Sequence, residues 1–155
     1  MITVYTAGPM TNQPNEGRDA FESAAQQLRD ANYDVVSPAE MDDEEGLVVG
    51  SNDPRTWARA LSRDLEVIET VDGVVLLDGW EGSRGACLEA EHGLRHGKFV
   101  ITLQGAIEAA NPKDPESPCT CEEGFCAVGF GYALLDQRWC RASKPVAERV
   151  MGWRS

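Results

Sequence analysis

The stretch 71–101 constrains the fold more than any other part of the chain, because it reads as a strand, a polar loop, a helix and a second strand. The run 74–77 (VVLL) is short and apolar, which is typical of a strand buried on both faces. The run 99–103 has the same character, and Gly97 is placed to end the helix before it. This β-α-β unit predicts a parallel sheet that binds its ligands at the carboxyl ends of the strands.

The polar loop 78–85 (DGWEGSRG) is expected at that edge of the sheet. Its glycines let the backbone approach a ligand closely, and the helix N-terminus that follows favours anions. We therefore predict a binding loop, whose candidate contacts are Asp78, Trp80, Ser83, Arg84 and Gly85.

Two acidic residues fall on the apolar faces of predicted helices. Glu89 shares a face with small apolar residues, and Asp64 lies in the apolar stripe of a helix that Asp53 and Pro54 are expected to start. Glu89 is either a partner of the helix dipole or a catalytic carboxylate. Asp64 is either bonded to backbone N–H groups or an acid in a pocket. As a pair, they suggest glycosidic cleavage, in which one carboxylate attacks the anomeric carbon and another group manages the leaving group.

The N-terminal strand ends at the turn Gly8-Pro9, and we predict that both residues of this turn contact the ligand. Tyr5, near its end, is either a simple β-former or a group that orients the nucleophile by a hydrogen bond. Asn15 is expected to cap the following helix. Arg18, in the first turn of that helix, is either a solvated charge or an anion-binding arginine that faces the site.

The other elements are less sharply patterned. A second strand is predicted at 34–37. The acidic segment 39–53 shows no hydrophobic period and is predicted to be a long loop. It lacks the residue arrangement of a calcium-binding loop. The proline-bearing stretch 104–124 is predicted to be another loop. Either a fifth strand or a helical C-terminus is expected from 125–150, with helices over 127–138 and around Ser143 in the helical case.

Length and charge limit the function classes. A chain of 155 residues predicts one domain, 1–155. Its net charge of −12 argues against binding to a nucleic-acid polymer. A local pocket can still hold a small anion. No run approaches the roughly 18 apolar residues of a membrane span. The N-terminus lacks the basic and apolar regions of a signal peptide, so we expect a cytoplasmic protein in a bacterial or phage-infected cell.

Cysteine usage agrees with a reducing compartment. There are five cysteines, an odd number, so reduced thiols are expected. The spacing of the C-terminal group matches no standard zinc pattern, and we predict free thiols rather than a metal site for Cys119, Cys121, Cys126 and Cys140.

Four segments together resemble the nucleoside 2-deoxyribosyltransferase superfamily, which includes 2′-deoxynucleoside 5′-monophosphate N-glycosidases and small phage and bacterial relatives of unassigned function. The segments are VYTAGP at 4–9, DLEVIETVD at 64–72, SRGACLE at 83–89, and Gly97-Lys98. The resemblance covers about residues 1–103 and leaves 104–155 unassigned. The chain departs from the family at Phe99, where members carry proline, and at 91–92, where many carry Gly-Tyr.

The resemblance implies a doubly wound, flavodoxin-like parallel sheet with helices on both faces, and it implies chemistry at three residues. Glu89 would be the nucleophile that attacks C1′ of a deoxyribosyl group, Asp64 would protonate the leaving base, and Tyr5 would position Glu89. Water or a second base would then resolve the covalent sugar–enzyme ester, so a hydrolase and a transferase both stay open. We expect a low pKa for the nucleophile, because the helix N-terminus has the right sign of field.

The resemblance also implies a small nucleotide or nucleoside as the partner. Ser83 and the backbone around Gly85 would hold a 5′-phosphate, with Asn15 and Arg18 nearby. No metal or organic cofactor is implied, and a homodimer or higher homo-oligomer would complete the pocket. Two alternatives stay open: a nucleotide-binding sensor without turnover, and a protein-interaction module that uses the acidic segment and the cysteine-bearing tail.

Overall fold

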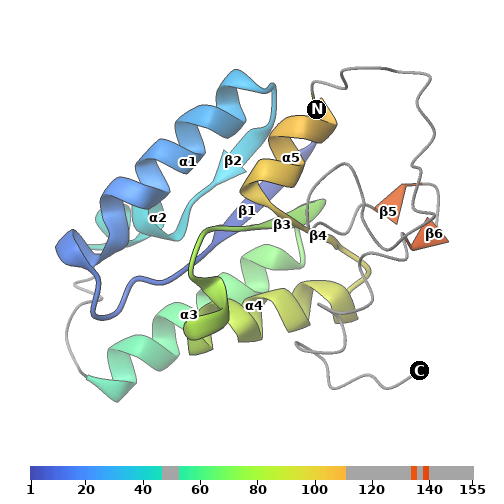
Figure 1. Cartoon of the computed structure of the whole chain (residues 1–155). Coiled ribbons are helices and arrows are strands. Elements are labelled where there is room, and N and C mark those ends of the chain that lie inside the picture. Colours follow the sequence, from blue (N-terminus) through green and yellow to red (C-terminus); the bar gives the residue numbers. More distant parts are fainter. Residues whose placement is uncertain (47–52, 111–133, 136–137, 140–155) are drawn as a thin grey trace.

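The fold is a four-stranded parallel sheet flanked by helices (Figure 1). The computed structural model describes residues 1–46 and 53–110, together with the backbone of 134–135 and 138–139. The sheet order is β2-β1-β3-β4, with β1 at Thr3–Ala7, β2 at Asp34–Val36, β3 at Gly73–Leu76 and β4 at Phe99–Thr102. All three pairings are parallel, which confirms the predicted doubly wound, flavodoxin-like architecture.

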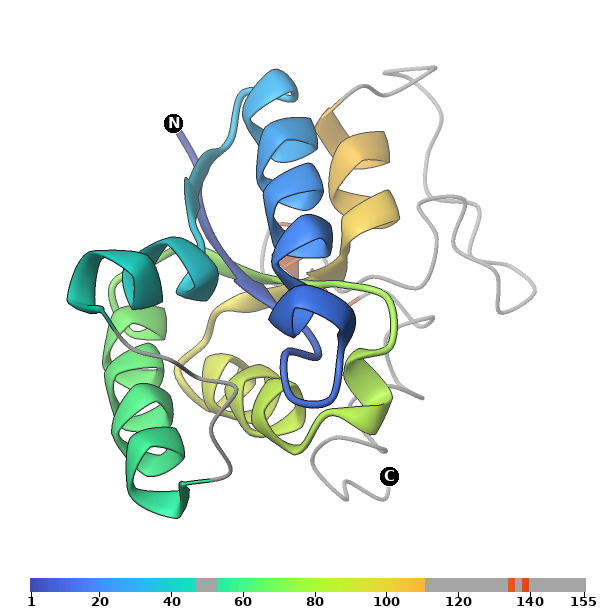
Figure 2. The ribbon, with the colours of Figure 1, turned by 90° about the vertical axis from the view of Figure 1, so that its left-hand side faces the viewer.

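Helices cover both faces of this sheet (Figures 1 and 2). One face carries α1 (Arg18–Asp30) and α5 (Leu103–Ala110), and the other carries α3 (Pro54–Ile68) and α4 (Arg84–Arg95). The shorter elements are α2 (Pro38–Glu45), the 3-10 turns η1 (Pro14–Gly17) and η2 (Trp80–Gly82), and an antiparallel pair of β5 (Leu134–Leu135) with β6 (Arg138–Trp139). No helix among the described residues is long and apolar enough to cross a membrane.

The central strands send alternate side chains to the two layers. Val4 and Val75 pack into the cluster under α1 and α5, whereas Tyr5 and Val74 pack into the cluster under α3 and α4. All four side chains are fully buried, as expected for central strands of a sheet with two covered faces. This alternation directs Tyr5 toward the two helices that carry Glu89 and Asp64.

Helix α3 begins as its sequence predicts. Asp53 is the N-cap residue, and its carboxylate accepts hydrogen bonds from the backbone N–H groups of Arg55 and Thr56, both at 3.3 Å. Pro54 occupies the first turn, where its missing N–H costs nothing.

The predicted cap of α1 is wrong. Gly17 is the N-cap residue at φ +72°, and a Cβ there would lie 2.5 Å from the Pro9 carbonyl oxygen. Glycine is required by both the backbone conformation and the close approach. The Asn15 amide instead donates to Asp19 at 2.9 Å.

Three other sequence-based assignments are corrected. The segment predicted as an acidic loop contains α2, which has Pro38 in its first turn and ends at Gly46 in the left-handed conformation. The segment predicted as a loop from 104 contains most of α5, whose start is capped by Thr102 through a 3.1 Å hydrogen bond from the Gly105 N–H. Strand pairing at 134–135 and 138–139 replaces part of the helix predicted over 127–138. The predictions for the four C-terminal cysteines and Ser143 lie outside the described residues.

Candidate active site

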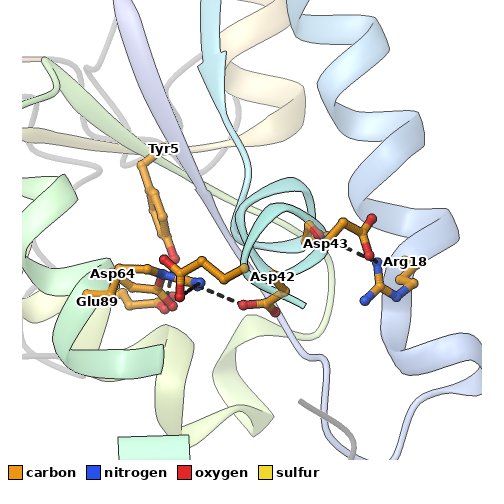
Figure 3. A network of polar contacts seen from close by, with 9 residues as sticks. Tyr5, Arg18, Asp42, Asp43, Asp64 and Glu89 are labelled. Carbon is orange, nitrogen blue, oxygen red and sulfur yellow. Dashed lines mark hydrogen bonds and ion pairs between the residues drawn. The ribbon is translucent and has the colours of Figure 1, made fainter. Parts of the chain in front are cut away.

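Three elements bring an acid–acid–tyrosine group together beneath the carboxyl edge of the sheet. The Tyr5 hydroxyl, from β1, donates to Glu89 Oε1 of α4 at 3.0 Å. Asp64, from α3, lies beside them, and Figure 3 shows the three side chains gathered at one place. Tyr5 is fully buried, and Asp64 and Glu89 are only 6% and 7% exposed. Burial of two carboxylates together is costly, which makes this pair a candidate functional site.

A single guanidinium connects Asp64 to a third acid. Arg63 donates to Asp64 Oδ1 from Nε at 3.0 Å and from Nη2 at 2.7 Å, and Nη2 also donates to Asp42 Oδ1 at 2.8 Å. Asp42 belongs to α2 and is 1% exposed. Arg63 thereby places one positive charge between two buried carboxylates and ties α2 to α3.

The environment raises the pKa of both central acids. Burial and the negative charge of Asp64 raise the pKa of Glu89 to about 8, against the opposing effect of the Tyr5 hydrogen bond. Burial raises the pKa of Asp64 to about 6, against the opposing hydrogen bonds and charge of Arg63. The low pKa that we expected for Glu89 is therefore wrong, because desolvation outweighs the field of the helix N-terminus. At neutral pH the pair shares one proton.

The pair opens into a cavity of about 560 Å³. Asp64 and Glu89 both line it, together with the start of α3 and the segment 10–13 that follows β1. Six of the predicted binding residues also line it: Gly8, Pro9, Asp78, Ser83, Arg84 and Gly85. A cavity of this size accommodates a small organic ligand.

One wall of the cavity is the N-terminal end of α4. Ser83 is the N-cap residue, and its Oγ accepts a hydrogen bond from the Ala86 N–H at 3.3 Å. The Arg84 guanidinium lies over the Trp57 ring, 5.3 Å from the ring centre. A cation, an aromatic face and a helix N-terminus therefore border the same space, which is a favourable setting for an anionic or planar ligand.

Comparison with known proteins places the chain in a family without describing its activity. A family model described as a domain of unknown function (DUF4406) matches residues 2–102. The chain belongs to this family. No curated protein matches the DUF4406 chain. Among solved structures, it is 25% identical to a 2-deoxyribosyltransferase from Bacillus psychrosaccharolyticus, over 64% of this chain and 70% of that one, with a TM-score of 0.47.

Three predicted binding residues of the DUF4406 chain have other surroundings. Arg18 forms ion pairs with Glu16 and Asp43, and Figure 3 shows the Arg18–Asp43 pair apart from the central acids. Asn15 is engaged with Asp19, as described above. Trp80 is 7% exposed because its ring packs into the core under α3 and α4. None of the three lines the cavity.

Sequence reasoning missed Arg63 and Asp42. Arg63 lies outside the apolar stripe of α3, but its long side chain reaches the carboxylate of the next residue, Asp64. Asp42 falls in a segment with no visible period. A weak signal existed in the placement of Pro38 and Gly46, which are typical of a helix start and stop around Asp42. The cavity wall formed by Trp57 was also missed, since its position in an apolar stripe indicated only packing.

Proposed function

We propose that this DUF4406 protein cleaves the N-glycosidic bond of a 2′-deoxynucleoside 5′-monophosphate or of the corresponding nucleoside. The observation that carries the proposal is the buried hydrogen bond from Tyr5 to Glu89, beside Asp64, at the wall of a ligand-sized cavity. The segment SRGACLE, which ends at Glu89, supports the proposal through its resemblance to deoxyribosyl-transferring enzymes.

The first step forms a covalent sugar ester. A carboxylate oxygen of Glu89 attacks C1′ of the deoxyribosyl group, and the bond from C1′ to the base nitrogen breaks. The electron pair of that bond goes to the base, which takes up the proton held by Asp64. Tyr5 positions Glu89 for this attack, because its hydrogen bond fixes the orientation of that carboxylate.

The second step releases the sugar. A water molecule attacks C1′ and gives a proton to the Asp64 carboxylate, and the ester bond to Glu89 breaks with its electron pair returning to the carboxylate. If a second base enters in place of water, its nitrogen attacks C1′ and gives its proton to the Asp64 carboxylate. The ester bond to Glu89 breaks as before, and the product is a new nucleoside or nucleotide. The same two acids therefore serve a hydrolase and a transferase.

The protonation state of the pair sets the pH range of the reaction. The reactive form has an ionised Glu89 and a protonated Asp64. With pKa values of about 8 and 6, the singly protonated pair prevails between those pH values, and its proton rests mainly on Glu89. The reactive form is a minor tautomer of that pair. Positive charge develops on the sugar in the transition state and stabilises an ionised Glu89. The transition state therefore favours the reactive form, in which Asp64 carries the proton.

The cavity wall at the start of α4 supports a 5′-monophosphate over a free nucleoside. The backbone N–H groups of the first helical turn favour an anion, and Arg84 adds a cation at the same wall. The Ser83 hydroxyl accepts the capping hydrogen bond and keeps its own proton for a phosphate oxygen. We propose Ser83, Arg84 and the Gly85 N–H as the phosphate contacts.

Release of free base tests the proposal. The protein is incubated with the 2′-deoxynucleoside 5′-monophosphates and the matching nucleosides, and free base is followed by chromatography with and without an added second base. Glu89→Gln and Asp64→Asn should lower the release rate by about 1000-fold or more. Glu91→Gln, on the same helix but paired with Arg95, is the matched control and should retain wild-type release.

One observation favours a second candidate, a nucleotide sensor without turnover. Because the pKa of Glu89 is raised to about 8, its carboxyl group is protonated near neutral pH and can donate a hydrogen bond to a ligand oxygen. A sensor would show ligand-induced thermal stabilisation with no base released from any member of the panel. Base release that is lost in Glu89→Gln would exclude it.

A further inference from the structure

Both histidines of the chain lie together, near the C-terminal ends of the two helices that carry the carboxylate pair. The sequence contains two histidines, His92 and His96. They stand one turn apart near the end of α4, and Glu69 follows the end of α3 beside them. One ligand atom from each of the three residues lies within 4.8 Å of the other two. The cavity, in contrast, is bordered by the first turns of α3 and α4 and by Asp64 and Glu89, and none of the three cluster residues lines it.

The spacing of these atoms fits a small divalent metal ion. His92 Nε2 lies 2.9 Å and His96 Nε2 lies 3.5 Å from Glu69 Oε1. Ligand atoms around a tetrahedral zinc ion, with bonds of about 2.1 Å, are separated by about 3.4 Å. The three side chains therefore need little rearrangement to meet one ion.

The second nitrogen of His96 supports the same assignment. Its Nδ1 lies 2.9 Å from the backbone carbonyl oxygen of His92, to which it can donate only when it carries the proton. That tautomer leaves the lone pair on Nε2, the atom that faces Glu69. Metal-binding histidines usually donate their other ring N–H to a carbonyl or carboxylate in this way.

The surroundings also favour a cation. Glu69 and His96 are the C-cap residues of α3 and α4, so the negative ends of two helix dipoles meet at this cluster. The three side chains are 22% to 49% exposed, which leaves room for water to complete the coordination.

We propose that Glu69, His92 and His96 form a binding site for a divalent transition-metal ion of the zinc class, which joins the C-terminal ends of α3 and α4. One carboxylate and two imidazoles form a ligand set suited to zinc and to cobalt, nickel or copper, rather than to magnesium or calcium. On binding, the ion takes the place of the proton between His92 Nε2 and Glu69, and the neutral His92 ring then carries its one proton on Nδ1. The site requires no part of the proposed glycosidase chemistry.

Metal titration of the full chain, free of any histidine tag and stripped with a chelator, tests the site. Calorimetry with Zn²⁺ should show binding at one site, which weakens by about 100-fold or more in His92→Gln, His96→Gln and Glu69→Gln. Saturating Zn²⁺ should raise the melting temperature of the wild type by about 5 °C and that of the variants by much less. Glu91→Gln, adjacent to His92 but outside the cluster, should behave as the wild type.

The Co²⁺ spectrum distinguishes this site from the chain's thiols. Co²⁺ should give ligand-field bands without the intense near-ultraviolet band of a cobalt–thiolate bond, and these bands should be lost in the histidine variants. Absence of Zn²⁺ binding, unchanged affinity in all three variants, or a thiolate band that persists in them would overturn the proposal. The base-release assay reports on Asp64 and Glu89, and the metal titration needs no substrate, so failure of one proposal is separable from failure of the other.

Discussion

Tyr5 links the central strand of the sheet to both buried acids. Burial and the charges of Glu89 and Asp64 raise the pKa of Tyr5 well above its ordinary value of 10.0, so its hydroxyl keeps its proton and acts as a donor at neutral pH. Because that hydrogen bond favours the ionised form of Glu89, Tyr5 is expected to influence how readily the nucleophile becomes available.

Substitution of Tyr5 by phenylalanine should therefore shift the pH dependence of kcat/KM as well as lower kcat. The wild type should show a bell-shaped dependence of kcat/KM, with limbs near the pKa values of about 6 and 8. In Tyr5→Phe we expect kcat to fall by about 10- to 100-fold and the alkaline limb to move upward, because Glu89 holds its proton more tightly. A lower rate with unmoved limbs would leave Tyr5 only a packing role.

Arg63 is expected to stabilise the fold rather than to take part in bond breaking, because it neutralises the buried carboxylates of Asp42 and Asp64. Arg63→Met leaves Asp42 and Asp64 buried without their cation, and we expect a loss of about 3 kcal/mol in the free energy of unfolding at pH 8. The loss should shrink at pH 5, where Asp64, whose pKa is about 6, becomes protonated and needs no cation.

Urea denaturation at the two pH values measures this effect. Arg59→Met removes an exposed arginine one turn earlier on α3 and is the matched control, expected to change stability by less than about 0.5 kcal/mol. Equal losses in the two variants would show that the bridge between Asp42 and Asp64 contributes little.

At the scale of elements, the site depends on how closely α4 approaches the sheet. Gly93 faces the core, and a Cβ there would lie 2.9 Å from Val74 Cγ2. That methyl group belongs to a stiff, fully buried side chain and has little room to move. Glu89 lies one turn before Gly93, so an outward shift of α4 would also draw Glu89 away from Tyr5.

Gly93→Ala is thus expected to destabilise the fold, although alanine is the better helix former. Overpacking should outweigh the propensity gain of about 1 kcal/mol and leave a net loss of about 1–2 kcal/mol. Gly85→Ala is the control on the same helix, because a Cβ at that position meets nothing closer than 4.0 Å. Thermal unfolding of the two variants gives the comparison, and a stabilised Gly93→Ala would show that the helix accommodates the methyl group.

Elements with strong periodicity were predictable from the sequence, and so were the residues on their faces. Asp64 and Glu89 were recognisable because each interrupts an apolar face, and both are buried beside the cavity. The parallel order of the strands followed from the β-α-β pattern. The catalytic roles of Tyr5, Asp64 and Glu89 stay predictions.

Elements whose stability comes from distant partners were not predictable. Helix α2 has no apolar period, and its buried Asp42 acquires its partner, Arg63, from a position 21 residues away. Helical spacing gives the direction in which a Cβ points, but it does not show where the end of a long arginine side chain will lie. The pKa of Glu89 was misjudged for a related reason, since desolvation depends on the whole packed structure.

At the scale of the whole molecule, the buried acids should make stability depend on pH. The pKa of Glu89 is about 8 and that of Asp64 is about 6 in the folded protein, against ordinary values of 4.5 and 3.8. The folded state therefore binds more protons than the unfolded state between these limits. The resulting stabilisation is fully present below the ordinary values and is lost as the pH rises through about 6 and then about 8.

We expect the free energy of unfolding to fall by about 2–4 kcal/mol between pH 5.5 and pH 9, measured by urea denaturation at constant ionic strength. Repulsion within a chain of net charge −12 has the same sign, because the charge grows as the pH moves away from a pI of about 4.5. Salt distinguishes the two causes. Surface repulsion is screened at about 1 M NaCl, whereas the desolvation of buried carboxylates is not.

Glu89→Gln separates the causes at the level of the molecule. Glutamine keeps the oxygen that accepts from Tyr5 but cannot ionise, so the variant should lose most of the pH dependence and become more stable than the wild type at pH 9. The same substitution should abolish base release. The carboxylate that lowers the stability of the fold at high pH would then be the one that the reaction requires. A pH dependence that vanishes in salt but persists in Glu89→Gln would place its origin on the surface instead.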